Sequence, residues 1–92
     1  MKLTPELKTF LAELAGGDLL LLDGCDEAFL GLDTDNRAVY GYAALVELFR
    51  TRDGMTEEES MEYIDYNIVR ALPYYPHGPI VMYMAEEFEG FL

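Results

Sequence analysis

The stretch Asp53–Tyr75, DGMTEEESMEYIDYNIVRALPYY, decides much of the predicted fold because it contains one strongly marked helix. Thr56, followed three residues later by Glu59, has the capping-box pattern that begins a helix. Apolar side chains then recur at helical spacing until Pro73, so we predict a helix from Thr56 to Leu72. The apolar stripe expected to face the core is Met61, Ile64, Ile68 and Leu72.

The same helix carries a dense group of acids with a single cation, Arg70, behind them. The acids are Glu57, Glu58, Glu59, Glu62 and Asp65, within nine residues. Acids in a first helical turn each stabilise the helix by roughly 0.3–1 kcal/mol through its dipole, which explains only the first three. Glu58 and Glu62 form an i,i+4 like-charge pair that costs a few tenths of a kcal/mol. Two interpretations therefore stay open, a merely solvated helix face and an acidic docking face.

Another amphipathic helix is predicted near the start of the chain. Thr4 and Pro5 suit the N-cap and first helical positions, and Gly16 follows the last apolar residue at helical spacing. The run Leu19–Leu22 comes next, and periodicity over so few residues cannot separate a strand from more helix. We favour extended structure there only weakly.

The segment from residue 29 to 42 predicts a β-hairpin. Phe29–Leu32 and Val39–Tyr42 flank the turn-forming cluster Asp33–Asn36. Gly31 and Gly41 lie inside the two strands, where a glycine marks a bulge or a close backbone approach.

Downstream of the hairpin, apolar spacing predicts a helix around Leu45–Phe49 that Gly54 ends. Tyr74–Pro79 is expected to be a rigid loop. Ile80–Met84 is expected to be a strand, apolar as a central strand covered on both faces would be. A short helical tail follows. Residues 1–92 thus predict one small α+β domain with an antiparallel or mixed sheet of about three strands packed against three helices.

Net charge constrains the choice of partner more than any motif does. Eighteen acids and six bases give −12, of which residues 1–52 contribute −4 and residues 53–92 contribute −8. Such a charge repels nucleic acid and anionic membranes and attracts basic surfaces. We therefore expect no direct nucleic-acid or membrane partner, and a contact surface in the second half of the chain.

No pattern for catalysis or cofactor binding stands out. Cys25 is the one cysteine, so no internal disulfide is possible, and no signal peptide or membrane span is evident; we expect a cytoplasmic protein of the host cell. Cys25 and His77 are the only candidate nucleophile–base pair. The acids Asp23, Asp26 and Glu27 lie close together but do not match a calcium loop. We therefore expect a protein that is not an enzyme and has no metal or cofactor.

Tyrosines in and beyond the acidic helix supply candidate interface anchors. Tyr63 and Tyr66 flank the apolar stripe and divide between core and surface, whereas exposed tyrosines would suit a partner rich in arginine and lysine. The predicted partner-binding residues are Glu57, Glu58, Glu62, Asp65, Tyr74 and Tyr75.

Six short motifs lie between residues 23 and 84: Asp26-Glu27-Ala28, Val39-Tyr40-Gly41-Tyr42, Asp53 to Ser60, Glu62 to Asn67, Arg70 to Tyr74 and Pro79 to Val81. With these motifs, residues 23–84 resemble a group of small proteins encoded by bacteriophages and prophages. Ser60 stands where the group has alanine, a harmless change in a helix. The resemblance implies a shared fold and a phage setting, and it carries over no catalytic residue.

Small acidic phage proteins include inhibitors of host defence, and anti-CRISPR and anti-restriction proteins often place carboxylates where nucleic acid carries phosphates. By that analogy we expect a binding protein that inhibits a basic, nucleic-acid-binding host complex, such as a CRISPR surveillance complex. The alternative is a non-enzymatic phage regulatory or structural protein. It would act as a homo-oligomer, for example a homodimer, through an apolar patch at Ile80–Met84 or at the tail, residues 88–92.

Overall fold

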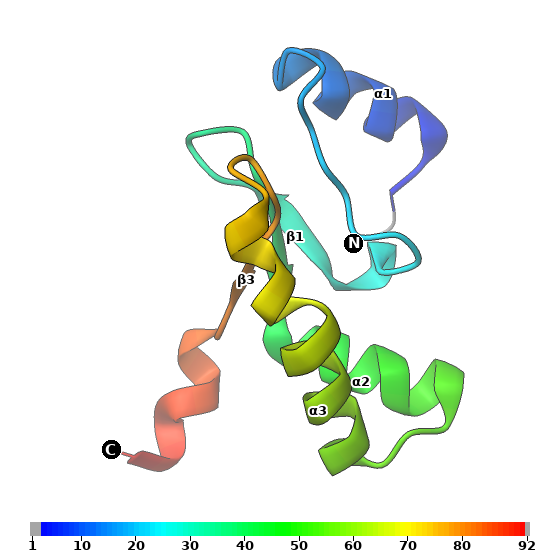
Figure 1. The fold of residues 1–92 in the computed structure, drawn as a ribbon, viewed down its shortest axis with the longest axis vertical. Coiled ribbons are helices and arrows are strands. Elements are labelled where there is room, and N and C mark those ends of the chain that lie inside the picture. Colours follow the sequence, from blue (N-terminus) through cyan, green and yellow to red (C-terminus); the bar gives the residue numbers. More distant parts are fainter. Residues whose placement is uncertain (1–2, 92) are drawn as a thin grey trace.

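A three-stranded mixed sheet lies at the middle of the computed structural model, which describes residues 3–91 (Figure 1). Strand β1 (Phe29–Leu32) pairs antiparallel with β2 (Ala38–Gly41), and β2 pairs parallel with β3 (Ile80–Met82). The strand order is β1-β2-β3, so β2 is the central strand.

Figure 1 shows the sheet between one helix at one end of the molecule and two crossing helices at the other. The α-helices are α1 (Pro5–Leu14), α2 (Tyr42–Asp53) and α3 (Glu57–Asn67), and the short 3-10 helices are η1 (Asp26–Ala28), η2 (Val69–Tyr74) and η3 (Ala85–Phe91). The predicted α+β class, with about three strands and three helices, is confirmed.

The hairpin forms as predicted because its turn residues satisfy the backbone locally. The Asp33 carboxylate accepts hydrogen bonds from the backbone N–H groups of Asp35 and Arg37 at 2.9 and 2.8 Å. Asn36 has a φ of 61°, a left-handed conformation that asparagine tolerates. The strand register shifts between Phe29 and Gly31, and Gly31 has a φ of 153°. Gly31 therefore marks the predicted bulge.

The helix boundaries also follow local chemistry. Thr4 caps α1 by accepting from the Leu7 N–H at 3.1 Å. Thr56 and Glu59 form both hydrogen bonds of the capping box, at 3.0 and 3.1 Å. Gly54 ends α2 in the left-handed conformation, with a φ of 69°. The starts of α1 and α3 and the end of α2 are therefore confirmed.

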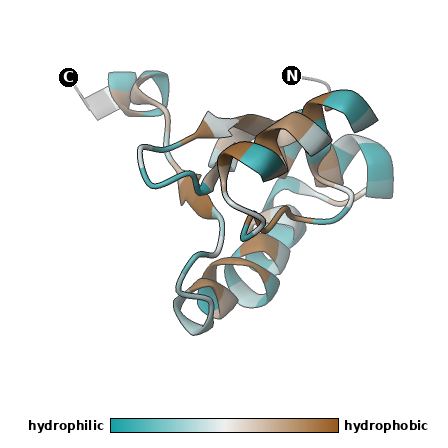
Figure 2. Ribbon diagram, turned by 90° about the horizontal axis from the view of Figure 1, so that it is seen from above, coloured by the Kyte–Doolittle hydropathy of each residue, from teal (hydrophilic) through white to brown (hydrophobic). Residues whose placement is uncertain are grey.

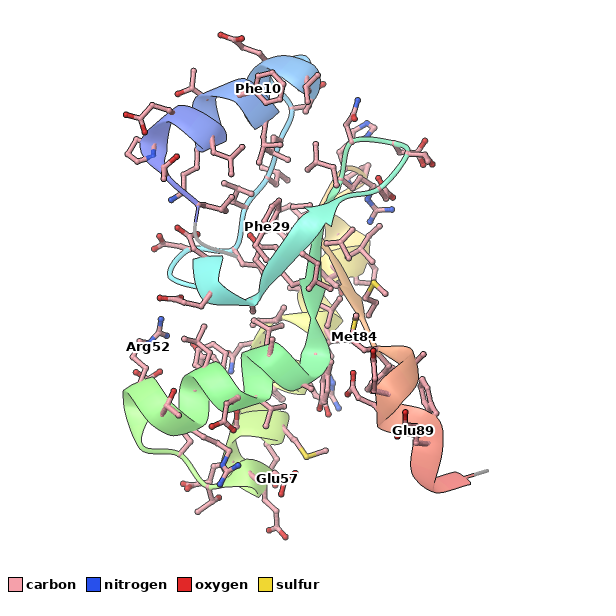
Figure 3. All side chains as sticks on the ribbon, turned by 180° about the vertical axis from the view of Figure 1, so that it is seen from behind. Phe10, Phe29, Arg52, Glu57, Met84 and Glu89 are labelled. Atoms are coloured by element: carbon pink, nitrogen blue, oxygen red, sulfur yellow. The ribbon has the colours of Figure 1, made fainter. Side chains whose placement is uncertain are left out.

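The core gathers between the sheet and the inner faces of α2 and α3. Phe29, Tyr40, Leu45 and Ile64 are almost completely buried. The rings of Phe29 and Tyr40 meet edge to face, with centroids 5.7 Å apart. Figure 3 shows Phe29 pointing into the interior, and Figure 2 shows hydrophobic residues on the strands and on parts of the helices.

The run Leu19–Leu22 is neither strand nor helix. It runs along the core as irregular chain, and three of its four leucines pack against the buried cluster. The Leu22 N–H donates to the Tyr40 hydroxyl at 2.8 Å, so a side chain replaces a strand partner there. The weak preference for extended structure did not produce a strand.

Helix α3 is shorter than predicted. It ends at Asn67, and the chain continues as the tighter helix η2, which contains Pro73. Proline lacks a backbone N–H and restricts the residue before it, so regular α-helix cannot reach Leu72. The predicted stripe also needs correction, because the Met61 side chain is 39% exposed and lies outside the core.

The last strand occupies a different place from the one predicted. Strand β3 covers only Ile80–Met82 and lies at the sheet edge, where Met82 and Tyr83 are exposed. The apolar run was misleading because its last residues face the C-terminal η3 rather than a second covering layer. Its parallel pairing with β2 is long-range, and the intervening helices provide the crossover.

Ser60 tests how closely α2 and α3 pack. Its side chain is completely buried, and its hydroxyl donates to the Val46 carbonyl at 2.9 Å. We expect Ser60→Leu to lower the free energy of unfolding by about 1–3 kcal/mol through overpacking. Ser60→Ala should change it by less than about 1 kcal/mol, because the lost hydrogen bond is partly offset by helix propensity. Urea unfolding compares the two, and equal stabilities would contradict this packing.

Candidate functional site

The outward face of α3 carries two of the predicted acids. Ser60, Ile64 and Ile68 are buried on one side of the helix, so Glu58 and Glu62 point away from the core. These two carboxylates are four residues apart, a rise of about 6 Å along the axis. We call Glu58, Glu62 and Tyr66, which follow one another at four-residue spacing, the outer face.

Sequence spacing allows Tyr66 to lie either in the core or at the surface, and the structure places it on the outer face. Its side chain is 70% exposed, and the Arg70 guanidinium carbon lies 5.2 Å from the centre of its ring. Its position four residues after Glu62 could have predicted this exposure from the sequence, because residues at that spacing share one face of a helix. The outer face therefore begins with two carboxylates and ends with an aromatic ring and a cation.

Glu57 and Asp65 lie on one flank of α3. Asp65 accepts a hydrogen bond from the Tyr42 hydroxyl at 3.3 Å, and Glu57 borders a groove that Met61 and Tyr42 also line. Figure 3 shows Glu57 projecting away from the body of the molecule. The four predicted acids are thus exposed but divided between the outer face and this flank.

The two predicted tyrosine anchors lie beyond the acidic helix. Tyr74 ends η2 with a side chain that is 83% exposed. Tyr75 borders a shallow hollow with Pro76, His77 and Asp18. The structure places both at the surface, on a different element from the acids.

The charges of α3 are not neutralised within the part of the chain that the structure describes. The ion pairs in residues 3–91 join Lys8 to Asp26 at 2.8 Å, Arg50 to Glu47 at 3.3 Å and Arg52 to Asp53 at 3.2 Å. None of them includes an acid of α3. The carboxylates of this helix are therefore available to cations from outside.

Glu59 differs from its neighbours because its carboxylate is part of the helix cap. Hydrogen bonds from the Thr56 backbone and side chain lower the pKa of its carboxyl. That stabilisation is present above the ordinary glutamate pKa and is lost as the pH falls through the lowered value. We assign Glu59 to the helix cap rather than to the binding surface.

The residues considered for catalysis lie in ordinary structural settings. Cys25 is buried, its thiol donates to the Asp23 carbonyl at 3.6 Å, and burial raises its pKa. His77 is exposed in the loop before β3, and no hydrogen bond joins it to Cys25. Asp26 is paired with Lys8. Within residues 3–91, no group of three or more His, Cys, Asp or Glu side chains is placed to hold a metal ion.

Two buried tyrosines predict a loss of stability in alkali. Burial raises the pKa of Tyr40 to about 12, and burial together with the Asp65 charge raises that of Tyr42 to about 12. The unfolded chain loses these protons near pH 10. The stabilisation is thus fully present below about pH 10 and is lost as the pH rises toward 12. Urea unfolding at about pH 8, 10 and 11.5 should show this decline, and Tyr42→Phe should reduce it. A flat profile in both proteins would contradict the prediction.

Comparison with known proteins gives no further guide to this surface, since no family model, curated protein or solved structure matches the chain. Across residues 3–91, the helices are too short and too polar to cross a bilayer.

Proposed function

We propose that this chain is a non-enzymatic, phage-encoded binding protein that inhibits a host defence complex through its acidic surface. The acids of α3 would occupy a basic channel that normally holds DNA or RNA, as in a CRISPR surveillance complex. The observation that carries the proposal is the exposure of Glu57, Glu58, Glu62 and Asp65 without an ion pair in the described chain.

The spacing and direction of these side chains suit contact with a basic groove. Glu58 and Glu62 repeat along one line at about 6 Å, which places two negative charges close together on the outer face. Glu57 and Asp65 extend the charge around one flank of the helix. Tyr66 adds an exposed ring that can pack on arginine from the partner.

Capture from a bacterial lysate tests this function. The tagged chain should retain a basic, nucleic-acid-binding protein or complex at low salt and release it at high salt, because exposed charge contacts are screened. Mass spectrometry of the eluate would name the partner. Recovery of the chain alone at low salt would contradict the proposal.

A second candidate is a phage regulatory or structural protein that acts as a homo-oligomer. It is favoured by exposed apolar side chains near the sheet edge, where Tyr83 is 57% and Phe88 is 47% exposed. Of the two patches predicted from sequence, Ile80–Met84 and Phe88 of the tail contribute here, whereas the Phe91 side chain and Leu92 lie outside the described part of the chain. Self-association that is insensitive to salt in sedimentation would support this candidate over the first.

A further inference from the structure

An apolar groove of about 560 Å³ lies beside the acidic helix, between the beginnings of α2 and α3 and the C-terminal η3. Its lining includes Tyr42, Val46, Met61, Tyr83 and Phe88. The ring centroids of Tyr42 and Tyr83 are 4.9 Å apart, and those of Tyr83 and Phe88 are 5.9 Å apart. Three aromatic side chains and a methionine thus form a continuous, partly exposed wall.

Carboxylates border this apolar surface on three elements. Glu47 comes from α2, Glu57 from α3 and Glu87 from η3, and no lysine or arginine lines the groove. Arg50 offsets part of this charge through its exposed pair with Glu47 at 3.3 Å. The combination of an aromatic wall with an acidic border favours a ligand that is apolar at its centre and positive at its edges.

We propose that this groove binds an amphipathic cationic helix of the partner, with apolar side chains on the aromatic wall and lysine or arginine beside the carboxylates. The inference rests on the proposed function for the class of partner and adds a second, apolar contact beside the acidic one. Methionine and tyrosine suit such a surface because methionine adapts its shape and tyrosine is enriched at binding hot spots.

Charge complementarity selects this occupant over a second copy of the chain. The molecule carries a net charge of −12, so a copy seated in the groove would bring further acids toward Glu57 and Glu87. A basic helix would instead contribute opposite charge at the same places. Helix-in-groove recognition commonly combines apolar anchors with such a charged border.

The test uses the full chain and a synthetic helical peptide of leucine and lysine, about fourteen residues or four turns long. In nuclear magnetic resonance titrations, the peptide should shift the signals of Val46, Met61 and residues 83–88. Tyr83→Ser combined with Phe88→Ala should weaken binding by about tenfold or more. Phe10→Ala is the matched control, since it removes an exposed aromatic side chain of α1 outside the groove and should leave the affinity unchanged.

Other outcomes overturn the groove proposal, and they separate it from the proposed function. If the peptide does not bind, or if a leucine–glutamate peptide of the same pattern binds equally well, the groove does not select a cationic helix. A third outcome is that Glu58→Gln with Glu62→Gln abolishes peptide binding, whereas the groove variant, Tyr83→Ser with Phe88→Ala, still binds. The peptide then contacts the outer face, which contradicts the groove proposal and leaves the proposed acidic function standing. Dimers that disappear in the groove variant would identify a second copy as the occupant.

Discussion

Neutralising the four predicted acids of α3 is expected to weaken partner binding by about 100-fold or more while leaving the fold intact. The variant is Glu57→Gln, Glu58→Gln, Glu62→Gln and Asp65→Asn. Each carboxylate is exposed and free of ion pairs in residues 3–91, so its loss removes attraction to the partner without breaking an internal ion pair. Affinity for the captured partner at low salt is the measurement.

The stability of this variant should change little. Each acid lost from the first turn lowers the stability of the helix by roughly 0.3–1 kcal/mol. Removing the repulsion between Glu58 and Glu62 restores a few tenths of a kcal/mol. Asparagine at position 65 keeps an oxygen that can accept the hydrogen bond from the Tyr42 hydroxyl. Circular dichroism and urea unfolding would verify the fold before any binding result is interpreted.

A matched control separates the position of the acids from their number. Glu6→Gln, Glu13→Gln, Asp18→Asn and Asp35→Asn neutralise four exposed acids elsewhere, and either set changes the formal net charge from −12 to −8. The control should bind nearly as well as the natural chain. Equal loss in both variants would show that net charge, rather than α3, governs binding.

Replacing Tyr40 with alanine is expected to have the largest effect on stability. Tyr40 is completely buried on the central strand, its ring packs on Phe29, and its hydroxyl accepts from the Leu22 N–H at 2.8 Å. Truncating a buried aromatic side chain costs about 3–5 kcal/mol. For a chain of 92 residues, the total free energy of unfolding is about 5–14 kcal/mol. Calorimetry should therefore show a melting temperature lower by roughly 15–30 °C.

Tyr40→Phe is the companion variant because it keeps the ring and removes only the hydroxyl. The Leu22 N–H then loses its acceptor, which should cost about 1–2 kcal/mol. If phenylalanine were as damaging as alanine, the hydrogen bond rather than the ring would organise the core. If alanine had little effect, the described core would be wrong.

Much of the fold could be predicted because it depends on local signals. The Thr56–Glu59 capping box, the Asp33–Asn36 turn and Gly54 each act within a few residues, and each forms as predicted. The place of β3 depends instead on parallel pairing across the intervening helices. Apolar composition alone cannot distinguish a central strand from an edge strand whose side chains meet a tail.

Helical spacing alone gave an incomplete account of burial. Phe10 and Leu14 of α1 continue the apolar pattern of Leu7 and Leu11, yet they are exposed while the other two pack against the core. Met61 likewise follows the stripe of α3 and lies outside the core. A helix buries only the part of its apolar stripe that another element reaches, and that reach is set by the tertiary arrangement.

The candidate surface was predictable only where it depends on helical spacing within α3. Exposure of Glu58 and Glu62 follows from their position opposite Ile64 on the helix. Tyr83 and Phe88 are predicted from sequence only as self-association patches, because the contacts of Tyr83 with Tyr42 and with Phe88 depend on the tertiary arrangement of the C-terminal segment. No spacing rule in the sequence brings these elements together.

The most direct test of the account is competition between this chain and nucleic acid for the captured partner. The partner would be purified with the tagged chain bound, and DNA or RNA of its natural ligand class would be added at constant salt. Nucleic acid is expected to release the chain in proportion to its own binding, and the variant neutralised on α3 is expected to bind the partner about 100-fold or more weakly. A partner that holds nucleic acid and the chain at the same time, with neither weakening the other, would contradict the claim that the acids occupy a nucleic-acid site.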